Sequence, residues 1–291
     1  MRRLAASALV AIGIASAARG DEPASPIVGA DWVHAAMATA EGVTLVDVRD
    51  RFEYQAGHVK GAANAASSEF LATVGGLPGM MPSPDAITSL ARRLGVRRDR
   101  PVVVYGNGNE PFAARAELTF RLCGHPNAHF LDGGFDAARK AGLPISTESE
   151  SIAPGDFSAT PATAGIVDGK WIASHLSDGN VVLVDTRTAR EFDRGHIPGA
   201  RRVEWRDNLA DGKLRSDAEL WKTYAPCALA PKELSSKTVV CYCAIGTRAS
   251  VNVLALERLG FTRVLLYPGS WAEWSHGDFP IEKTTPNEKP R

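Results

Sequence analysis

The chain has 291 residues, of which 44% are hydrophobic and 23% are charged, the balance of an ordinary globular protein. Lys plus Arg and Asp plus Glu both number 33, so the composition lacks the basic excess of nucleic-acid-binding proteins, and we expect no nucleic-acid partner. The length exceeds what one compact core usually needs and suits two domains.

The N-terminus has the pattern of a secretory signal peptide. A basic start, Met1-Arg2-Arg3, precedes an apolar run from Leu4 to Ala15, and Ala15-Ser16-Ala17 fits an A-x-A cleavage site. The alternative is a membrane anchor, but this run is too short and too rich in alanine to span a hydrocarbon core of about 30 Å. We therefore expect residues 1–20 to be removed on export, which leaves no membrane span. In a bacterium the compartment would be the periplasm.

An internal repeat divides the remaining chain into two similar halves. Residues 45–62 recur as residues 183–200, with nine of the eighteen positions identical, including the pattern Leu-Val-Asp-x-Arg. The similarity continues downstream, where Val102–Tyr105 aligns with Val239–Tyr242. Two homologous domains are predicted.

The domain boundaries follow from the limits of the repeat and from a change in composition. The first domain is predicted to cover residues 26–147 and the second residues 164–285. Between them, residues 148–163 are rich in Ser, Thr, Pro and Ala and show no apolar periodicity, which is typical of a linker.

Within each copy, segments typical of strands alternate with segments typical of helices. In the second copy, short apolar runs predict strands at Val181–Val184, Thr238–Tyr242 and Arg263–Tyr267. Apolar residues on one face predict a helix at Ser250–Leu259, and Asp168 is expected to cap a shorter helix. This alternation indicates an α/β fold in which each domain is a mainly parallel sheet with helices on both faces.

The segment most informative about chemistry joins the predicted strand Thr238–Tyr242 to the helix after it. Cys243 is the first residue of this connection, at the carboxyl end of a strand, where open α/β sheets bind ligands. Loop amides before a helix N-terminus bind anions, so the helix dipole and Arg248 should favour the thiolate of Cys243. Gly246 would allow a tight turn. This role also requires that a small anion can reach the sulfur.

The chain has four cysteines, at positions 123, 227, 241 and 243. Two disulfides would be possible in an exported protein, but the spacing of Cys241 and Cys243 in one strand-like run matches no zinc pattern and does not favour a disulfide framework. We expect at least one free functional thiol, and neither a metal nor another cofactor. Cys241 is interpreted as a buried residue, with a resolving thiol as the alternative.

These features together resemble the tandem-domain rhodanese family of thiosulfate sulfurtransferases, over essentially the whole mature chain. The resemblance rests on five features of the second domain: Leu183-Val184-Asp185-x-Arg187, Glu191-Phe192, the run Gly195–Ala200, the Cys243 loop and the run Gly269–Trp274. In that family the C-terminal domain carries the catalytic cysteine and the N-terminal domain has lost it. In this chain Cys243 aligns with Gly106, so the first domain is predicted to be catalytically silent.

The resemblance implies a reaction in which Cys243 takes the outer sulfur of thiosulfate as a persulfide and passes it to cyanide, a small thiol or a protein thiol. The loop residues Ala244, Ile245, Gly246, Thr247 and Arg248 would bind the anionic donor. The spacing C-x4-R encloses one residue fewer than the C-x5-R of related phosphatases, which favours sulfur over phosphate. Relatives that prefer 3-mercaptopyruvate have an Arg where this chain has Glu191, which favours thiosulfate.

Two alternatives stay open: a 3-mercaptopyruvate sulfurtransferase, and a non-catalytic rhodanese module that binds a partner or senses redox state. Asp185, Arg187 and His196 are interpreted as structural, because their counterparts recur in the domain without the cysteine. Trp271 and Trp274 are expected to pack in the core.

Overall fold

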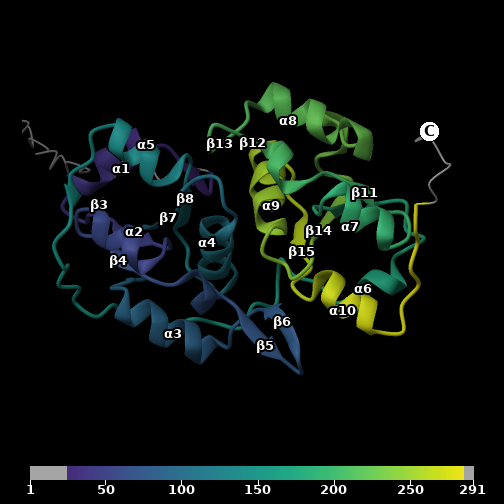
Figure 1. Ribbon diagram of the computed structural model, residues 1–291, viewed down its shortest axis with the longest axis horizontal. Helices are drawn as coiled ribbons and strands as arrows, with labels where there is room; N and C mark the ends of the chain where they lie inside the picture. The colour runs from purple at the N-terminus through teal and green to yellow at the C-terminus, as the bar shows by residue number, and fades with distance from the viewer. Residues whose placement is uncertain (1–24, 285–291) are drawn as a thin grey trace, which may run out of the picture.

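The computed structural model describes residues 25–284, which form two lobes side by side along the long axis of the molecule (Figure 1). The predicted signal peptide, residues 1–20, lies outside the described residues. Among residues 25–284, no helix combines the length and the apolar content that a bilayer crossing requires.

Each lobe is built on a parallel sheet, and the two sheets have the same strand order. The order is β1-β8-β7-β2-β4 in the first lobe and β11-β10-β14-β15 in the second, where a parallel bridge between Ile166 and Leu266 takes the place of β1. The strands of the two sheets are β1 (Ile27–Val28), β2 (Thr44–Asp47), β4 (Ala63–Asn64), β7 (Val102–Tyr105), β8 (Ala128–Leu131), β10 (Val181–Asp185), β11 (Arg201–Arg202), β14 (Thr238–Tyr242) and β15 (Val264–Leu266).

Helices cover both faces of each sheet, which confirms the predicted α/β fold. They are α1 (Ala30–Met37), α2 (Arg51–Ala56), α3 (Pro84–Arg93), α4 (Phe112–Leu122), α5 (Gly134–Lys140), α6 (Gly169–Ser174), α7 (Ala189–Arg194), α8 (Asp217–Tyr224), α9 (Ala249–Arg258) and α10 (Ser270–His276). Short 3-10 helices lie at Ser67–Phe70, Trp205–Asn208, Ala225–Cys227 and Pro231–Glu233. Asp168 caps α6 as predicted, because its carboxylate accepts a hydrogen bond from the amide of Trp171 at 2.8 Å.

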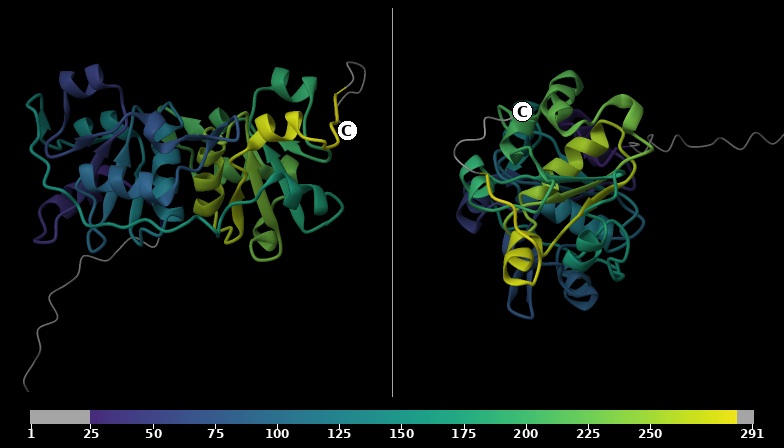
Figure 2. Two further views of the ribbon diagram at one scale, coloured as in Figure 1. Left: turned by 90° about the horizontal axis from the view of Figure 1, so that it is seen from below. Right: turned by 90° about the vertical axis from the view of Figure 1, so that its right-hand side faces the viewer.

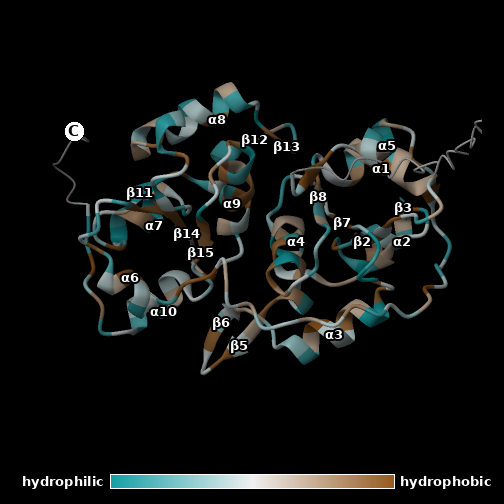
Figure 3. Ribbon diagram, turned by 180° about the vertical axis from the view of Figure 1, so that it is seen from behind, coloured by the Kyte–Doolittle hydropathy of each residue, from teal (hydrophilic) through white to brown (hydrophobic). Residues whose placement is uncertain are grey.

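The core is shared between the lobes because side chains alternate across each strand. In β7, Val102 and Val104 face a central cluster that also contains residues of α4, α9 and β14, whereas Val103 and Tyr105 face an outer cluster under α1 and α5. The apolar colour of the central strands and facing helices is visible in Figure 3. Helices α4 and α9 pack against each other at the centre, so the two lobes share one continuous hydrophobic core.

The predicted linker has no helix or strand, but it packs against the first lobe (Figure 2). The amide of Phe157 donates to the carbonyl of Val96 at 3.1 Å, and its side chain is completely buried. The amide of Thr160 donates to the carbonyl of Cys123 at 2.8 Å. This segment is therefore fixed against the N-terminal domain.

Within residues 25–284, three antiparallel pairs of short strands lie outside the two parallel sheets: β3 (His58–Val59) with β9 (Ile145–Ser146), β5 (Ala72–Val74) with β6 (Leu77–Met80), and β12 (Leu209–Ala210) with β13 (Lys213–Leu214). The last two pairs are hairpins, whereas β3 and β9 are far apart in the sequence. The pair β5–β6 extends from the first lobe towards α10 of the second, as Figure 1 shows. It matters for the site because it reaches the loop that begins at Cys243.

Candidate active site

The loop of residues 243–248, called here the Cys243 loop, connects the end of β14 to the start of α9. Cys243 is held through its backbone by the first residues of α10. Its amide donates to Ser270 Oγ at 3.1 Å, and its carbonyl accepts from the amide of Trp271 at 3.0 Å. The structure thus places Cys243 where the sequence predicted, at the carboxyl edge of a parallel sheet and just before a helix N-terminus.

Gly246 gives the Cys243 loop its tight curvature. Its φ of 77° lies in the left-handed region that favours glycine. A Cβ at this position would approach the carbonyl oxygen of Pro268 to 2.7 Å and the Nη1 of Arg115 to 3.2 Å. The tight turn that the sequence predicted at Gly246 is confirmed, and the space around it excludes larger residues.

Arg248 lies at the other end of the loop and forms a two-point ion pair with Glu191 of α7. Its Nη1 and Nη2 donate to the two carboxylate oxygens at 2.9 and 2.7 Å. This hydrogen-bonded pairing, with the nearby sulfur of Cys243 as a smaller contribution, raises the pKa of Arg248 above its ordinary value. The same hydrogen bonds lower the pKa of Glu191 to about 2, so both groups are charged at neutral pH.

The sulfur of Cys243 is more enclosed than the sequence suggested. The side chain has 0% exposure, while Ala244, Ile245 and Arg248 are partly exposed. The expectation that a small anion can reach the sulfur directly is therefore wrong for this arrangement of the chain. The β5–β6 pair of the other lobe packs directly on this loop, since a Cβ on Gly79 would lie only 2.0 Å from the carbonyl oxygen of Ile245.

A cavity of about 870 Å³ lies between the lobes, but it does not provide this access. Residues of both lobes, including Met80, Trp171 and Pro268, line it, and no residue of the Cys243 loop does so within the described chain. Entry of a donor to the sulfur therefore requires movement of the loop or of the β5–β6 pair.

Hydrogen-bond donors in the Cys243 loop are left without acceptors. The backbone amides of Ala244 to Arg248 donate to no acceptor among residues 25–284. The hydroxyl of Thr247 is buried and also has no partner in that part of the chain. Because buried polar groups are normally paired, this loop has the donors expected of a binding site for a small anion.

The corresponding loop of the first lobe is filled by a carboxylate of its own chain. Glu110 Oε1 accepts from the amide of Asn107 at 3.2 Å, and Oε2 accepts from the amide of Phe112 at 2.5 Å. A Cβ on Gly106, the position aligned with Cys243, would lie 1.8 Å from Glu110 Oε1. Burial raises the pKa of Glu110, and the hydrogen bonds from these amides oppose that shift. The carboxylate thus occupies the space that a cysteine side chain would need.

Glu110 was not among the site residues predicted from the sequence, although the sequence contains a signal for it. In the ungapped alignment that pairs Gly106 with Cys243, Glu110 falls opposite Thr247. The first loop thus has an acidic residue where the second has a hydroxyl. This difference indicates that the first loop could be occupied by a carboxylate of its own chain.

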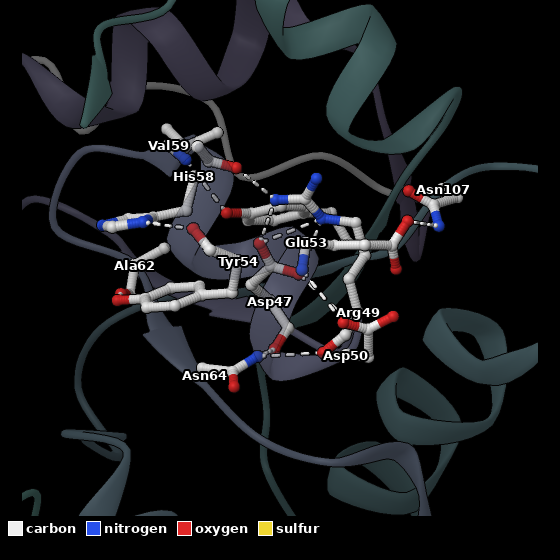
Figure 4. Close-up of polar contacts among 12 residues, drawn as sticks. Asp47, Arg49, Asp50, Glu53, Tyr54, His58, Val59, Ala62, Asn64 and Asn107 are labelled. Atoms are coloured by element: carbon white, nitrogen blue, oxygen red, sulfur yellow. Dashed lines mark hydrogen bonds and ion pairs between the residues drawn. The ribbon is translucent and has the colours of Figure 1, made fainter. Parts of the chain in front are cut away.

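The residues shared by both domains form matched buried pairs. Arg49 and Asp47 form an ion pair of 2.6 Å, and Arg49 also donates to the carbonyl of Gly57 at 2.7 Å (Figure 4). Arg187 makes the equivalent contacts with Asp185 and the carbonyl of Gly195 at the same distances. These side chains hold a strand end to the turn after a helix, which agrees with the structural role predicted for them.

The two histidines of the repeat are also held in the same way. His58 stacks on Tyr54, as Figure 4 shows, and His196 stacks on Phe192. In each case Nδ1 lies 2.9 Å from the carbonyl oxygen of the same aromatic residue. His196 thus has a structural environment that matches that of its counterpart in the first lobe.

The cysteines at positions 123, 227, 241 and 243 are all unpaired and buried. Burial raises the pKa of Cys227 to about 12 and that of Cys241 well above its ordinary value, so both remain neutral thiols. Trp274 is fully buried as predicted, and Trp271 packs over the guanidinium of Arg187 at 4.5 Å.

Comparison with known proteins agrees with this architecture. Residues 29–141 and residues 168–276 each match the family model of the rhodanese-like domain. The chain is 30% identical over 279 residues to 3-mercaptopyruvate sulfurtransferase of Escherichia coli, which covers 88% of this chain and 97% of that protein. It is 32% identical over 275 residues to thiosulfate sulfurtransferase of Corynebacterium glutamicum, covering 86% and 87%.

Among solved structures, a similar one is the crystal structure of the 3-mercaptopyruvate sulfotransferase SseA from Escherichia coli. The superposition has a TM-score of 0.76 at 27% sequence identity and covers 85% of this chain and 99% of that one.

Proposed function

The chain belongs to the rhodanese family and is a sulfurtransferase, and from this premise we propose that it moves sulfur from thiosulfate to a thiophilic acceptor through a persulfide on Cys243. One observation carries the proposal. The amides of Ala244 to Arg248 and the hydroxyl of Thr247 have no acceptor in the described chain, whereas in the other lobe Glu110 accepts from the amide of Asn107, which aligns with Ala244, and from the amide of Phe112. The loop that contains the cysteine is the one left free for an anion.

The proposed reaction has two nucleophilic steps. The Cys243 thiolate attacks the outer sulfur of thiosulfate, the bond between the two sulfur atoms of the donor breaks, and sulfite leaves with the electron pair. An acceptor such as cyanide then attacks the terminal sulfur of the persulfide, which forms thiocyanate and restores the thiolate. The loop amides would stabilise the negative charge in both steps, because fixed donors in a site without water are effective.

Thiosulfate is favoured over 3-mercaptopyruvate by the residue at position 191. The carboxylate of Glu191 already pairs with both terminal nitrogens of Arg248, so that guanidinium is occupied. A donor with a carboxylate remote from its sulfur would need an additional cation at this place, whereas the charge of thiosulfate lies next to the transferred sulfur, where the loop amides can bind it. The relatives themselves carry both names, so this preference rests on the local charges.

A donor and acceptor panel tests the proposal. Initial rates would be measured with thiosulfate or 3-mercaptopyruvate as donor and cyanide or a small thiol as acceptor, for the wild type and Cys243→Ser. We expect a higher kcat/KM for thiosulfate, parallel double-reciprocal lines and a loss of at least about 1,000-fold in the variant. Cys241→Ala is the matched control, since it removes a buried thiol two residues away.

Retained activity in Cys243→Ser would reject the persulfide on this residue. A kcat/KM that is higher for 3-mercaptopyruvate would leave the sulfurtransferase assignment intact and overturn only the choice of donor.

A further inference from the structure

Arg115 of the N-terminal domain reaches the Cys243 loop of the C-terminal domain. It lies on α4 and its side chain is nearly completely buried. Its Nη1 lies 3.5 Å from the carbonyl oxygen of Gly246, and its Nη2 donates to the carbonyls of Gly79 and Met80 at 3.1 and 3.2 Å. One guanidinium thus joins the loop with the cysteine to the β5–β6 pair that covers it.

The positive charge of Arg115 is not balanced by a carboxylate. No ion pair to it occurs among residues 25–284, and its Nε is buried without a hydrogen-bond partner there. Burial lowers the pKa of Arg115 to about 10, which still leaves it protonated at neutral pH, and the groups that oppose this shift are Cys243 and Cys123. Cys243 belongs to the loop that Arg115 contacts at Gly246, so its sulfur is the candidate for the missing negative charge.

The other arginine of the site cannot replace this charge. Arg248 is bound by the carboxylate of Glu191, so that pair is neutral as a unit. Arg115 and Arg248 both contact the loop or its sulfur, and among residues 25–284 an ion pair is present for Arg248 and absent for Arg115. An unpaired buried charge usually costs several kcal/mol, and an anion placed nearby removes much of that cost.

We propose that Arg115 is a positioning residue for sulfur transfer: from the silent domain it orients the Cys243 loop through Gly246 and supplies the charge that the anionic sulfur faces. This inference rests on the proposed role of Cys243. It gives the N-terminal domain a direct part in the chemistry, because the cation belongs to one domain and the sulfur to the other.

The alternative is that Arg115 only ties the β5–β6 pair to the loop. Its acceptors are backbone carbonyls and the sulfur of Met81, and a neutral donor could serve them equally well. The two roles differ in one respect, since only the electrostatic role distinguishes an anionic reagent from a neutral one.

The test measures alkylation of Cys243 by iodoacetate, which is anionic, and by iodoacetamide, which is neutral, with the modified peptide identified by mass spectrometry. Both reagents need the same opening of the loop to reach the sulfur. The equilibrium constant of this opening therefore cancels in the ratio of their rate constants. In Arg115→Met we expect the ratio of the iodoacetate to the iodoacetamide rate constant to fall about 10-fold relative to the wild type. Arg115→Lys, which keeps a charge, should restore most of the ratio.

Arg121→Met is the matched control. Arg121 lies on the same helix, pairs with the buried Glu117 at 2.7 Å and joins the lobes through a two-point ion pair with Glu257 at 2.9 Å. Among residues 25–284, no hydrogen bond or ion pair connects it to the Cys243 loop. Its loss should leave the ratio unchanged even if the interface loosens. Urea unfolding of each variant establishes that the alkylated species is folded.

An unchanged ratio in folded Arg115→Met, or an equal fall in Arg121→Met, would overturn the electrostatic role of Arg115. The ratio of alkylation rate constants does not depend on turnover. It can therefore still be measured if the activity of Cys243→Ser shows that the persulfide proposal is wrong.

Discussion

The two lobes contain the same strand, loop and helix, but the loops have opposite contents. In the first lobe, the carboxylate of Glu110 accepts hydrogen bonds from the amides of Asn107 and Phe112 and fills the space beside Gly106. In the second, Cys243 occupies the aligned position and the loop donors have no acceptor in the described chain. The comparison teaches that this loop is built to hold an anion, supplied by the chain in one lobe and left for a ligand in the other.

The comparison also separates residues that maintain the fold from residues that differ with function. The buried pairs Asp47–Arg49 and Asp185–Arg187 have the same geometry in both lobes. The contents of the loops differ, at Gly106 against Cys243 and at Glu110 against Thr247. Features that are common to both lobes therefore explain stability, and features that differ are the candidates for chemistry.

The largest effect should come from breaking the shared ion pairs. Asp47→Asn and Asp185→Asn each leave a buried guanidinium without its counter-ion, and we expect each to lower the free energy of unfolding by about 3–5 kcal/mol. Urea unfolding would measure this loss. A small effect in one lobe and a large one in the other would contradict the view that the two pairs serve the same purpose.

The next largest effect should follow from giving the second loop the carboxylate of the first. Thr247→Glu would place an acid opposite the position of Glu110, where it can accept the free amides and repel an anionic donor. We expect kcat/KM for thiosulfate to fall about 100-fold, measured from initial rates. Thr247→Gln is the control of the same size, and it should retain clearly more activity than the acidic variant.

The converse exchange should not create a second site. Gly106→Cys brings a Cβ within 1.8 Å of Glu110 Oε1, so the carboxylate must move and we expect a destabilisation of about 1–2 kcal/mol. In a Cys243→Ser background the new cysteine should take up no sulfur from thiosulfate, as peptide mass spectrometry would show. Transfer of a sulfur atom from thiosulfate to the new cysteine at position 106 would mean that Glu110 does not block the first loop.

The smallest effect concerns acid stability. The pKa of Glu191 is lowered from 4.5 to about 2 by its hydrogen bonds with Arg248, so the pair stabilises the fold fully above pH 4.5 and loses this effect as the pH falls towards 2. The difference in unfolding free energy between the wild type and Glu191→Gln should therefore shrink over this range.

Glu53, the counterpart of Glu191 in the first lobe, accepts a hydrogen bond from the neutral amide of Asn107 at 2.8 Å, as Figure 4 shows. Glu53→Gln is thus the matched control. Because both surface contacts are partly exposed, the expected effects are only about 1 kcal/mol or less. If the unfolding free energies of Glu191→Gln and Glu53→Gln, each relative to the wild type, changed with pH in the same way, the predicted difference between the two carboxylates would be wrong.

Much of the fold could be predicted from the sequence because the repeat and the apolar runs are local patterns. The strand Thr238–Tyr242 was predicted with its observed ends. The helix cap at Asp168 could be predicted because capping depends on the single side chain that precedes the helix. The predicted strand Arg263–Tyr267 is shorter in the structure, at Val264–Leu266. Cys243 could be placed at the sheet edge because strand order and helix position determine that edge.

The remaining features depend on contacts between residues far apart in the sequence. The packing of Gly79 against Ile245 and the approach of Arg115 to Gly246 both cross the domain interface. The linker was predicted without regular structure, but its attachment through Phe157 depends on a matching surface of the first lobe. None of these contacts leaves a periodic signal in the sequence.

The central claim, that Cys243 carries the transferred sulfur, is tested most directly by mass spectrometry of the protein after incubation with thiosulfate and removal of excess donor. The account predicts an added mass of one sulfur atom, located on the peptide that contains Cys243, absent in Cys243→Ser and discharged by cyanide. An unmodified Cys243 in an active enzyme, or a sulfur atom on another cysteine, would contradict it.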